Sequence, residues 1–128
     1  MRARVAAARV GRLGTVRPDG RPHLVPCCFA LAGATVYSAV DAKPKSTLAL
    51  QRLENVRAQP AVTLLVDHYA EDWSTLWWVR IDGTAAVVEG AERSAGLEAL
   101  RAKYDQYRAT PPPGPVLAIA VESWRAWP

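Results

Sequence analysis

The chain has few of the side chains on which catalytic and metal sites are usually built: of its 128 residues, only two are histidine and two are cysteine. Neither residue type shows a CxxC or HxxxH spacing, which argues against a zinc site. No serine lies in a nucleophile-elbow sequence, which argues against a Ser-His-Asp triad. The sequence therefore predicts no catalytic side-chain motif and no metal centre.

Long runs of one kind of residue are also absent. The formal net charge is +4, without the long block of like charges or basic-aromatic repeat that nucleic-acid binders show. No stretch approaches the ~20 apolar residues of a membrane span, and residues 1–9 lack the apolar core of a signal peptide. We expect a soluble cytoplasmic protein that contacts no nucleic acid and no membrane and prefers anionic small molecules.

The two cysteines, Cys27 and Cys28, are adjacent in the sequence. Their side chains point to opposite faces of an extended strand, so they are poor partners for one disulfide, which fits a reducing compartment. The length of the chain and its apolar content of 50% predict a single domain over residues 1–128 with one hydrophobic core.

The first 40 residues have the pattern of an antiparallel meander. Residues 10–16 alternate in character and meet the turn sequence Pro18-Asp19-Gly20, which predicts a hairpin into a second strand over 22–31 and a third over 35–40. Pro26 falls within the second strand. A proline there indicates an edge strand, a bulge or a break that faces a ligand.

The rest of the chain mixes strands with two helices, and residues 2–9 have helical composition. The apolar spacing predicts a helix that begins at Thr47 and ends before Gln59-Pro60, and a second helix over 91–108. Strands are predicted over 61–69, over 76–89 with a bulge at Gly83, and over 116–121 after a proline-rich connector. Six strands without a regular strand–helix alternation favour an antiparallel barrel over a doubly wound sheet.

The segment between the third strand and the first long helix carries two lysines and two hydroxyl side chains. Ser46 or Thr47 can cap the helix, whose first N–H groups and dipole attract anions, and Lys43 and Lys45 add positive charge. We interpret this segment as a site for a cofactor phosphate. An ordinary capped helix with solvated lysines explains the same residues equally well.

Tryptophans are concentrated in the second half of the chain. Adjacent Trp77 and Trp78 must face opposite sides of a strand, so one points inward and the other needs a cover, either a dimer interface or a planar ring stacked on it. Trp124 and Trp127 near the C-terminal end raise the same question.

Residues 12–26 resemble the opening hairpin of the pyridoxamine 5'-phosphate oxidase-like split-barrel superfamily. The likeness continues through residues 36–45, through the helix that ends at 59–62, and through the strand that contains residues 78–83. Within the superfamily, the chain is most similar to small actinobacterial oxidoreductases that use the deazaflavin coenzyme F-420.

The resemblance implies a mainly β fold with helices: a six-stranded, antiparallel, Greek-key-like split β-barrel with two flanking helices. It further implies a homodimer with a cofactor site at each end of the subunit interface. The cofactor-binding residues that match the family pattern are Val25, Pro26 and Cys27 along the ring; Ser38, Lys43, Lys45, Ser46 and Thr47 at the phosphate; Trp78 at the ring edge, from the partner subunit; and Trp124 and Arg125 near the C-terminal end.

The implied activity is transfer of a hydride from reduced F-420 to a small conjugated or quinone-like acceptor. Because the cofactor carries this chemistry, no catalytic triad is needed. FMN has a similar three-ring plane and a phosphate, so an FMN-binding flavoprotein oxidoreductase is one alternative, and a non-enzymatic F-420 carrier is another. For the anionic tail of F-420, Arg9, Arg12 and Arg17 are candidates for a basic groove.

Overall fold

The structure is a computed structural model that describes residues 1–40 and 47–128, with the side chains of all of these except residues 47–50. Its helices and strands follow one another along the chain in the order α1 (Arg2–Ala7), β1 (Gly11–Val16), β2 (Pro22–Cys27), β3 (Ala30–Ala32), β4 (Thr35–Ala39), α2 (Thr47–Ala58), β5 (Ala61–His68), the 3-10 turn η1 (Trp73–Thr75), β6 (Trp77–Val88), α3 (Gly90–Lys103), α4 (Asp105–Ala109) and β7 (Val116–Trp127).

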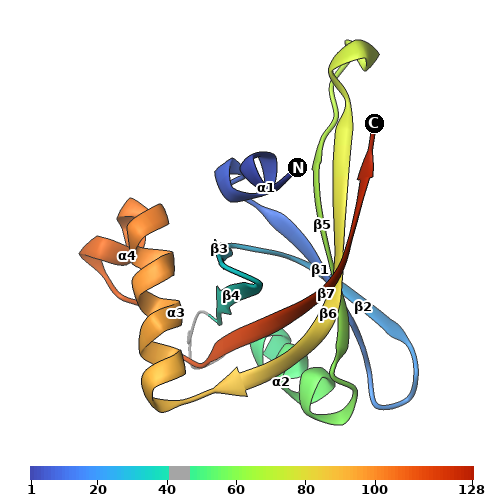
Figure 1. Cartoon of the computed structure of the whole chain (residues 1–128). Coiled ribbons are helices and arrows are strands. Elements are labelled where there is room, and N and C mark those ends of the chain that lie inside the picture. The colour runs from blue at the N-terminus through green and yellow to red at the C-terminus, as the bar shows by residue number, and fades with distance from the viewer. Residues whose placement is uncertain (41–46) are drawn as a thin grey trace.

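The strands form one curled antiparallel sheet in the order β2-β1-β5-β6-β7-β4-β3. Figure 1 shows α2 on one side of this sheet and α3 and α4 beyond β4, while the β5–β6 hairpin and the end of β7 extend together away from α2, α3 and α4. The mainly β split-barrel fold predicted from the sequence is thereby confirmed. The position of β2 at the sheet edge agrees with the proline in its interior.

The described residues contain seven strands rather than the predicted six, because the strand expected over 22–31 is broken at Cys28 and Phe29. The N–H of Phe29 donates to Tyr104 Oη at 3.1 Å, and its carbonyl accepts from Lys103 Nζ at 2.9 Å. The Phe29 backbone is therefore bonded to the α3 end rather than to a neighbouring strand, so the sheet pairing is interrupted there.

The predicted last strand, 116–121, extends in fact to Trp127, because β7 pairs with β6 along almost its whole length. The register shifts between Asp82 and Gly83, which confirms the predicted bulge. A Cβ atom at Gly83 would collide with the carbonyl oxygen of Ala120, so only glycine fits at this crossing.

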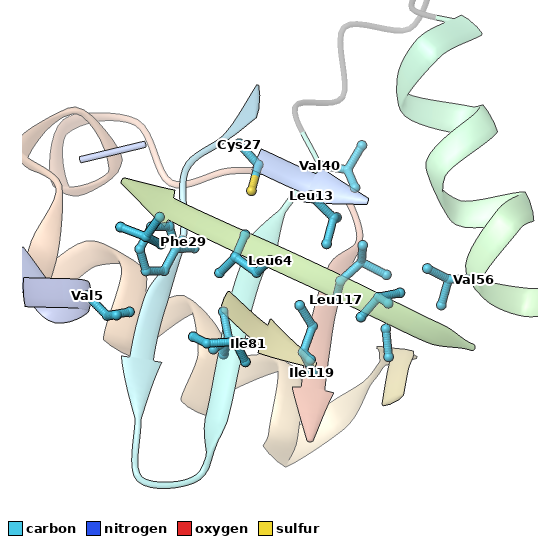
Figure 2. Close-up of a cluster of buried hydrophobic side chains, with 14 of the residues drawn as sticks. Val5, Leu13, Cys27, Phe29, Val40, Val56, Leu64, Ile81, Leu117 and Ile119 are labelled. Carbon is cyan, nitrogen blue, oxygen red and sulfur yellow. The ribbon is translucent and has the colours of Figure 1, made fainter. Parts of the chain in front are cut away.

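The main core lies inside the curl of the sheet. Figure 2 shows Leu64, Ile81 and Ile119 from the sheet at its centre, with Val5 reaching in from α1 and Val56 from α2. All of these side chains are at most 3% exposed. Burial of this cluster fixes which face of each strand points inward and which points outward.

A second, smaller core lies on the opposite face of β4. Tyr37 and Ala39 of β4 pack with Leu100 and Tyr104, whereas their neighbours Val36 and Val40 belong to the main core. The apolar face predicted for the helix over 91–108 is confirmed, but the helix is divided at Tyr104, where φ and ψ are extended. The Tyr104 hydroxyl, anchored to the Phe29 backbone, accounts for the division.

No helix among the described residues is long and apolar enough to cross a membrane.

Candidate functional site

The outward face of the sheet carries a row of side chains that runs across five strands. Because Leu13, Leu64 and Ile81 point into the core, the residues next to them in each strand point outward. The strand registers align these outward residues in the order Pro26, Arg12, Leu65, Arg80 and Arg125. We call this row, with the outward residues on either side of it, the outer sheet face.

A pocket of about 420 Å³ lies on the outer sheet face and is lined by Leu65, Asp67, Tyr69, Trp78 and Arg80. Arg12 forms an ion pair with Asp67 at 3.0 Å beside it. The pocket thus combines aromatic rings with charged side chains that form ion pairs, which suits a planar ligand that carries polar groups.

The two adjacent tryptophans face opposite ways, as predicted. Trp77 packs against the main core with Arg4 at 5.3 Å from its ring centroid, whereas Trp78 lines the pocket on the outer sheet face. Trp124 lies opposite Ile81 and packs against the main core. The guanidinium carbon of Arg2 lies over the Trp124 ring, 5.6 Å from the ring centroid. Trp78 and Trp124 therefore lie on opposite faces of the sheet.

Asp82 also lies on the outer sheet face, next to Arg80. Its carboxylate accepts from the Thr63 hydroxyl at 2.7 Å and from Arg80 and Ser123 at 3.3 Å. The Thr63 hydrogen bond is the main reason why the pKa of Asp82 lies below its usual value, with Arg80 adding to the effect. Asp82 is therefore ionised at neutral pH and balances part of the arginine charge.

A second group of predicted residues lies on the inner side of the sheet, at the ends of β2 and β4. Cys27 is 9% exposed and Ser38 is 1% exposed. The Ser38 hydroxyl donates to the carbonyl of Cys28 at 2.8 Å, so it holds the break between β2 and β3. Val25 lies on the inner side with Cys27, and Pro26 lies between them on the outer face.

Helix α2 covers this inner corner and places Arg52 in it. The Nε atom of Arg52 is buried and has no hydrogen-bond partner among the described residues. The positive charge of Arg52 acts to lower the pKa of both Cys27 and His23. For Cys27, burial is the larger effect and raises the pKa. For His23, burial lowers the pKa most, followed by the charges of Arg17 and Arg52. We call Arg52, His23 and Cys27 the α2 corner.

A chain of buried amides and hydroxyls holds α2 in place over the sheet. Asn55, which is fully buried, donates from Nδ2 to Thr15 Oγ1 at 3.0 Å and accepts from Gln51 Nε2 at 2.7 Å. Buried hydrogen bonds of this kind fix the rotation of a helix, because any other orientation leaves them unmade. The position of Arg52 is set by these contacts.

The structure describes no side chain for most of the residues that were predicted to bind the cofactor phosphate. Lys43, Lys45 and Ser46 are outside the described residues, and Thr47 is described only as the first backbone position of α2. Of the three arginines predicted to form a basic groove, Arg9 donates to the carbonyl of Lys103, Arg12 pairs with Asp67 on the outer sheet face, and Arg17 lies in the turn between β1 and β2.

The structure thus divides the predicted residues between two surfaces. Pro26, Trp78 and Arg125 reach the outer sheet face, and Cys27 and Ser38 reach the inner side. Sequence reasoning missed Arg52, His23 and Asn55. The sequence did contain one indication of a polar contact on this helix, because Gln51 and Asn55 are four residues apart and therefore lie on the same helix face.

Comparison with known sequences matches the whole chain, residues 1–128, to the family described as pyridoxamine 5'-phosphate oxidase. Comparison with curated proteins finds no significant match.

Solved structures with the same fold come from several bacteria. A conserved hypothetical protein from Mycobacterium tuberculosis is 25% identical with a TM-score of 0.77, over 98% of this chain and 80% of that one. A FAD-binding protein from Mesorhizobium loti is 25% identical with a TM-score of 0.71, over 98% and 87%. A heme-binding protein from Mycobacterium smegmatis is 20% identical with a TM-score of 0.78, over 98% and 52%, a likeness of fold alone.

Proposed function

The chain belongs to the pyridoxamine 5'-phosphate oxidase family, and we propose that it is an oxidoreductase that binds a tricyclic redox cofactor at the α2 corner. The cofactor we propose is the deazaflavin F-420, which in its reduced form supplies a hydride to a small conjugated or quinone-like acceptor. The observation that carries the proposal is the buried Nε of Arg52, which has no hydrogen-bond partner among the residues that the structure describes.

An arginine is charged at every physiological pH, so a buried N–H of its guanidinium that has no acceptor is costly. A phosphate oxygen at the α2 corner would supply that acceptor through a charge-assisted hydrogen bond. The same corner lies below α2, whose start follows Lys43, Lys45 and Ser46 in the sequence. We assign the phosphate to Arg52 together with these residues and the first N–H groups of α2.

Strand β2 is suited to hold the ring of the cofactor. It is the edge strand of the sheet, so the backbone groups on its side away from β1 have no strand partner in the described sheet. We propose that the backbone of Val25, Pro26 and Cys27 lies along the polar edge of the ring. The protein then orients the ring and excludes water, and no catalytic side chain is required. Ser38 supports this segment through its bond to Cys28.

The outer sheet face supports a homodimer. Leu24 on β2 is 70% exposed, Tyr69 just after the end of β5 is 66% exposed, and Trp127 is 48% exposed at the end of β7. Large apolar side chains gathered on one sheet face are typical of an interface. We propose that a second copy covers it and that Trp78 faces the partner's cofactor. Light scattering should give a dimer mass, and Leu24→Glu should give a monomer; a monomeric wild-type protein would refute the shared site.

FMN is the alternative cofactor, and the likeness to a FAD-binding protein favours a flavin. A fluorescence titration of the purified apo-protein with F-420 and with FMN separates the two. We expect binding of F-420 in the micromolar range. Binding of FMN without binding of F-420 would overturn the first choice and leave a flavoprotein of the same fold.

The third possibility is a carrier that holds F-420 without turnover. A protein described as heme-binding shares this fold. A carrier would bind reduced F-420 yet leave its absorbance unchanged when enones, quinones and nitro compounds are added. The proposed oxidoreductase should reoxidise the cofactor with at least one of these acceptors.

A further inference from the structure

A cavity of about 560 Å³ lies where the N-terminal segment meets the junction of α3 and α4, and the proposed cofactor site does not use it. Its lining combines basic, acidic, thiol, amide and phenol groups, from Arg9, Cys28, Lys103, Tyr104, Asp105, Gln106 and Tyr107.

The amine of Lys103 is held at the wall of this cavity in an apolar setting. Its Nζ donates to the Phe29 carbonyl at 2.9 Å, and it lies 3.9 Å from the centroid of the Phe29 ring and 5.2 Å from that of Tyr104. Among the ion pairs of the described residues, none includes Lys103. A partly buried ammonium without a carboxylate partner is easily deprotonated.

The charges that face Lys103 from each neighbouring element act in both directions. Burial and, to a smaller extent, the charge of Arg9 lower the pKa of Lys103 to about 8, whereas Cys28 and Cys27 act to raise it. Burial raises the pKa of Tyr104 to about 12, so its phenol stays neutral, and Asp105 lines the cavity on the α4 side. A neutral lysine amine is a nucleophile toward carbonyl carbon.

We propose that this cavity is a second ligand site, for small aldehydes that carry a carboxylate, and that Lys103 binds them covalently as an imine. The Nζ atom attacks the aldehyde carbon, and the C=N bond replaces the C=O bond. The carbonyl oxygen leaves as water with the two hydrogens of the neutral amine, so no oxidant or reductant is consumed. The Arg9 guanidinium, which lines the same cavity, is the partner for the carboxylate.

Reductive trapping tests the proposal independently of any redox cofactor. The protein is incubated with glyoxylate and cyanoborohydride, which reduces the imine to a stable secondary amine, and the labelled peptides are quantified by mass spectrometry. Lys43 and Lys45 are the only other lysines and serve as internal references, and peptide mapping separates the Met1 amine. At pH 7 we expect Lys103 to be labelled about tenfold or more faster than either reference, since each pKa unit changes the neutral fraction tenfold.

Two variants define the site. Lys103→Arg keeps the positive charge but should lose the label at this position. Arg9→Gln should lose the preference for glyoxylate over uncharged glycolaldehyde and should move the labelling midpoint to higher pH, because a repelling cation is removed. Labelling of Lys103 at the same rate as Lys43 and Lys45, or a midpoint in the ordinary lysine range, would overturn the proposal.

Discussion

Helices α2 and α3 each place one positively charged side chain close to the sheet. The two sides differ in whether their polar atoms have hydrogen-bond partners. On the α3 side, Lys103 donates to the Phe29 carbonyl, and Tyr104 bonds to the same backbone, so the polar groups there have partners. On the α2 side, Arg52 Nε and His23 Nδ1 are buried without a partner among the described residues. Among the described residues, the polar groups on the α3 side have partners, whereas these two atoms of the α2 corner have none.

The chemistry of the two cations explains what this difference means. Lysine can release its proton when it is buried, and Lys103 does so with a pKa of about 8. Arginine cannot, so a guanidinium whose Nε is buried needs an acceptor for that N–H, and an anion is the strongest one. We therefore assign the anionic end of the cofactor to the α2 corner and the neutral-amine chemistry to Lys103.

The largest expected effect is on cofactor affinity. Arg52→Met should weaken binding of the cofactor by about 1.5–3 kcal/mol, or roughly 10- to 150-fold, because a charge-assisted contact to phosphate is lost. Fluorescence titration measures this directly. Arg57→Met is the matched control, since Arg57 is exposed on the same helix and should change affinity little. Equal losses in the two variants would remove the distinction between Arg52 and any surface arginine.

In the cofactor-free protein, we expect Tyr104→Phe to lower the free energy of unfolding more than Arg52→Met does. Tyr104→Phe removes the acceptor of the buried Phe29 N–H and should lower the free energy of unfolding by about 1–3 kcal/mol. Arg52→Met removes a group whose buried Nε has no partner in the described part of the chain, and it should leave that free energy unchanged or raised. Urea unfolding of both variants tests this. A loss in Arg52→Met as large as that in Tyr104→Phe would mean that the α2 corner is already satisfied.

A smaller effect is expected from pH. Because the pKa of His23 is lower in the folded chain, the unfolded chain takes up its proton first as the pH falls. The stability from neutral His23 is therefore present above the unfolded pKa of about 6.5 and is lost progressively below it. His23→Gln should flatten the fall in urea midpoint between about pH 7 and pH 5. An unchanged slope in this variant would assign the pH dependence to other groups.

Local patterns in the sequence predicted most of the fold. Alternation identified the strands, the turn at Pro18-Asp19-Gly20 identified the first hairpin, and the adjacency of Trp77 and Trp78 required opposite faces. These features depend on neighbours in the sequence, so one chain is enough to recognise them.

The features that were missed depend on contacts between distant residues. The break at Phe29 arises from Tyr104, 75 residues away, and no local signal marks it. Arg52 occupies the side of α2 that periodicity assigns to solvent, and only the packing of α2 on β1 and β6 shows that its Nε atom is buried. The row from Pro26 to Arg125 depends on strand register, which pairing sets and composition does not.

We propose that Arg52 binds the phosphate of the cofactor, and a comparison of two protein variants with two ligands tests this most directly. Wild type and Arg52→Met are each titrated with a cofactor that has its phosphate and with the same ring system without it: F-420 against its phosphate-free deazaflavin chromophore, or FMN against riboflavin. We predict that the variant loses affinity by roughly 10- to 150-fold for the phosphate-bearing molecule and keeps its affinity for the phosphate-free one. An equal loss for both molecules would contradict the assignment.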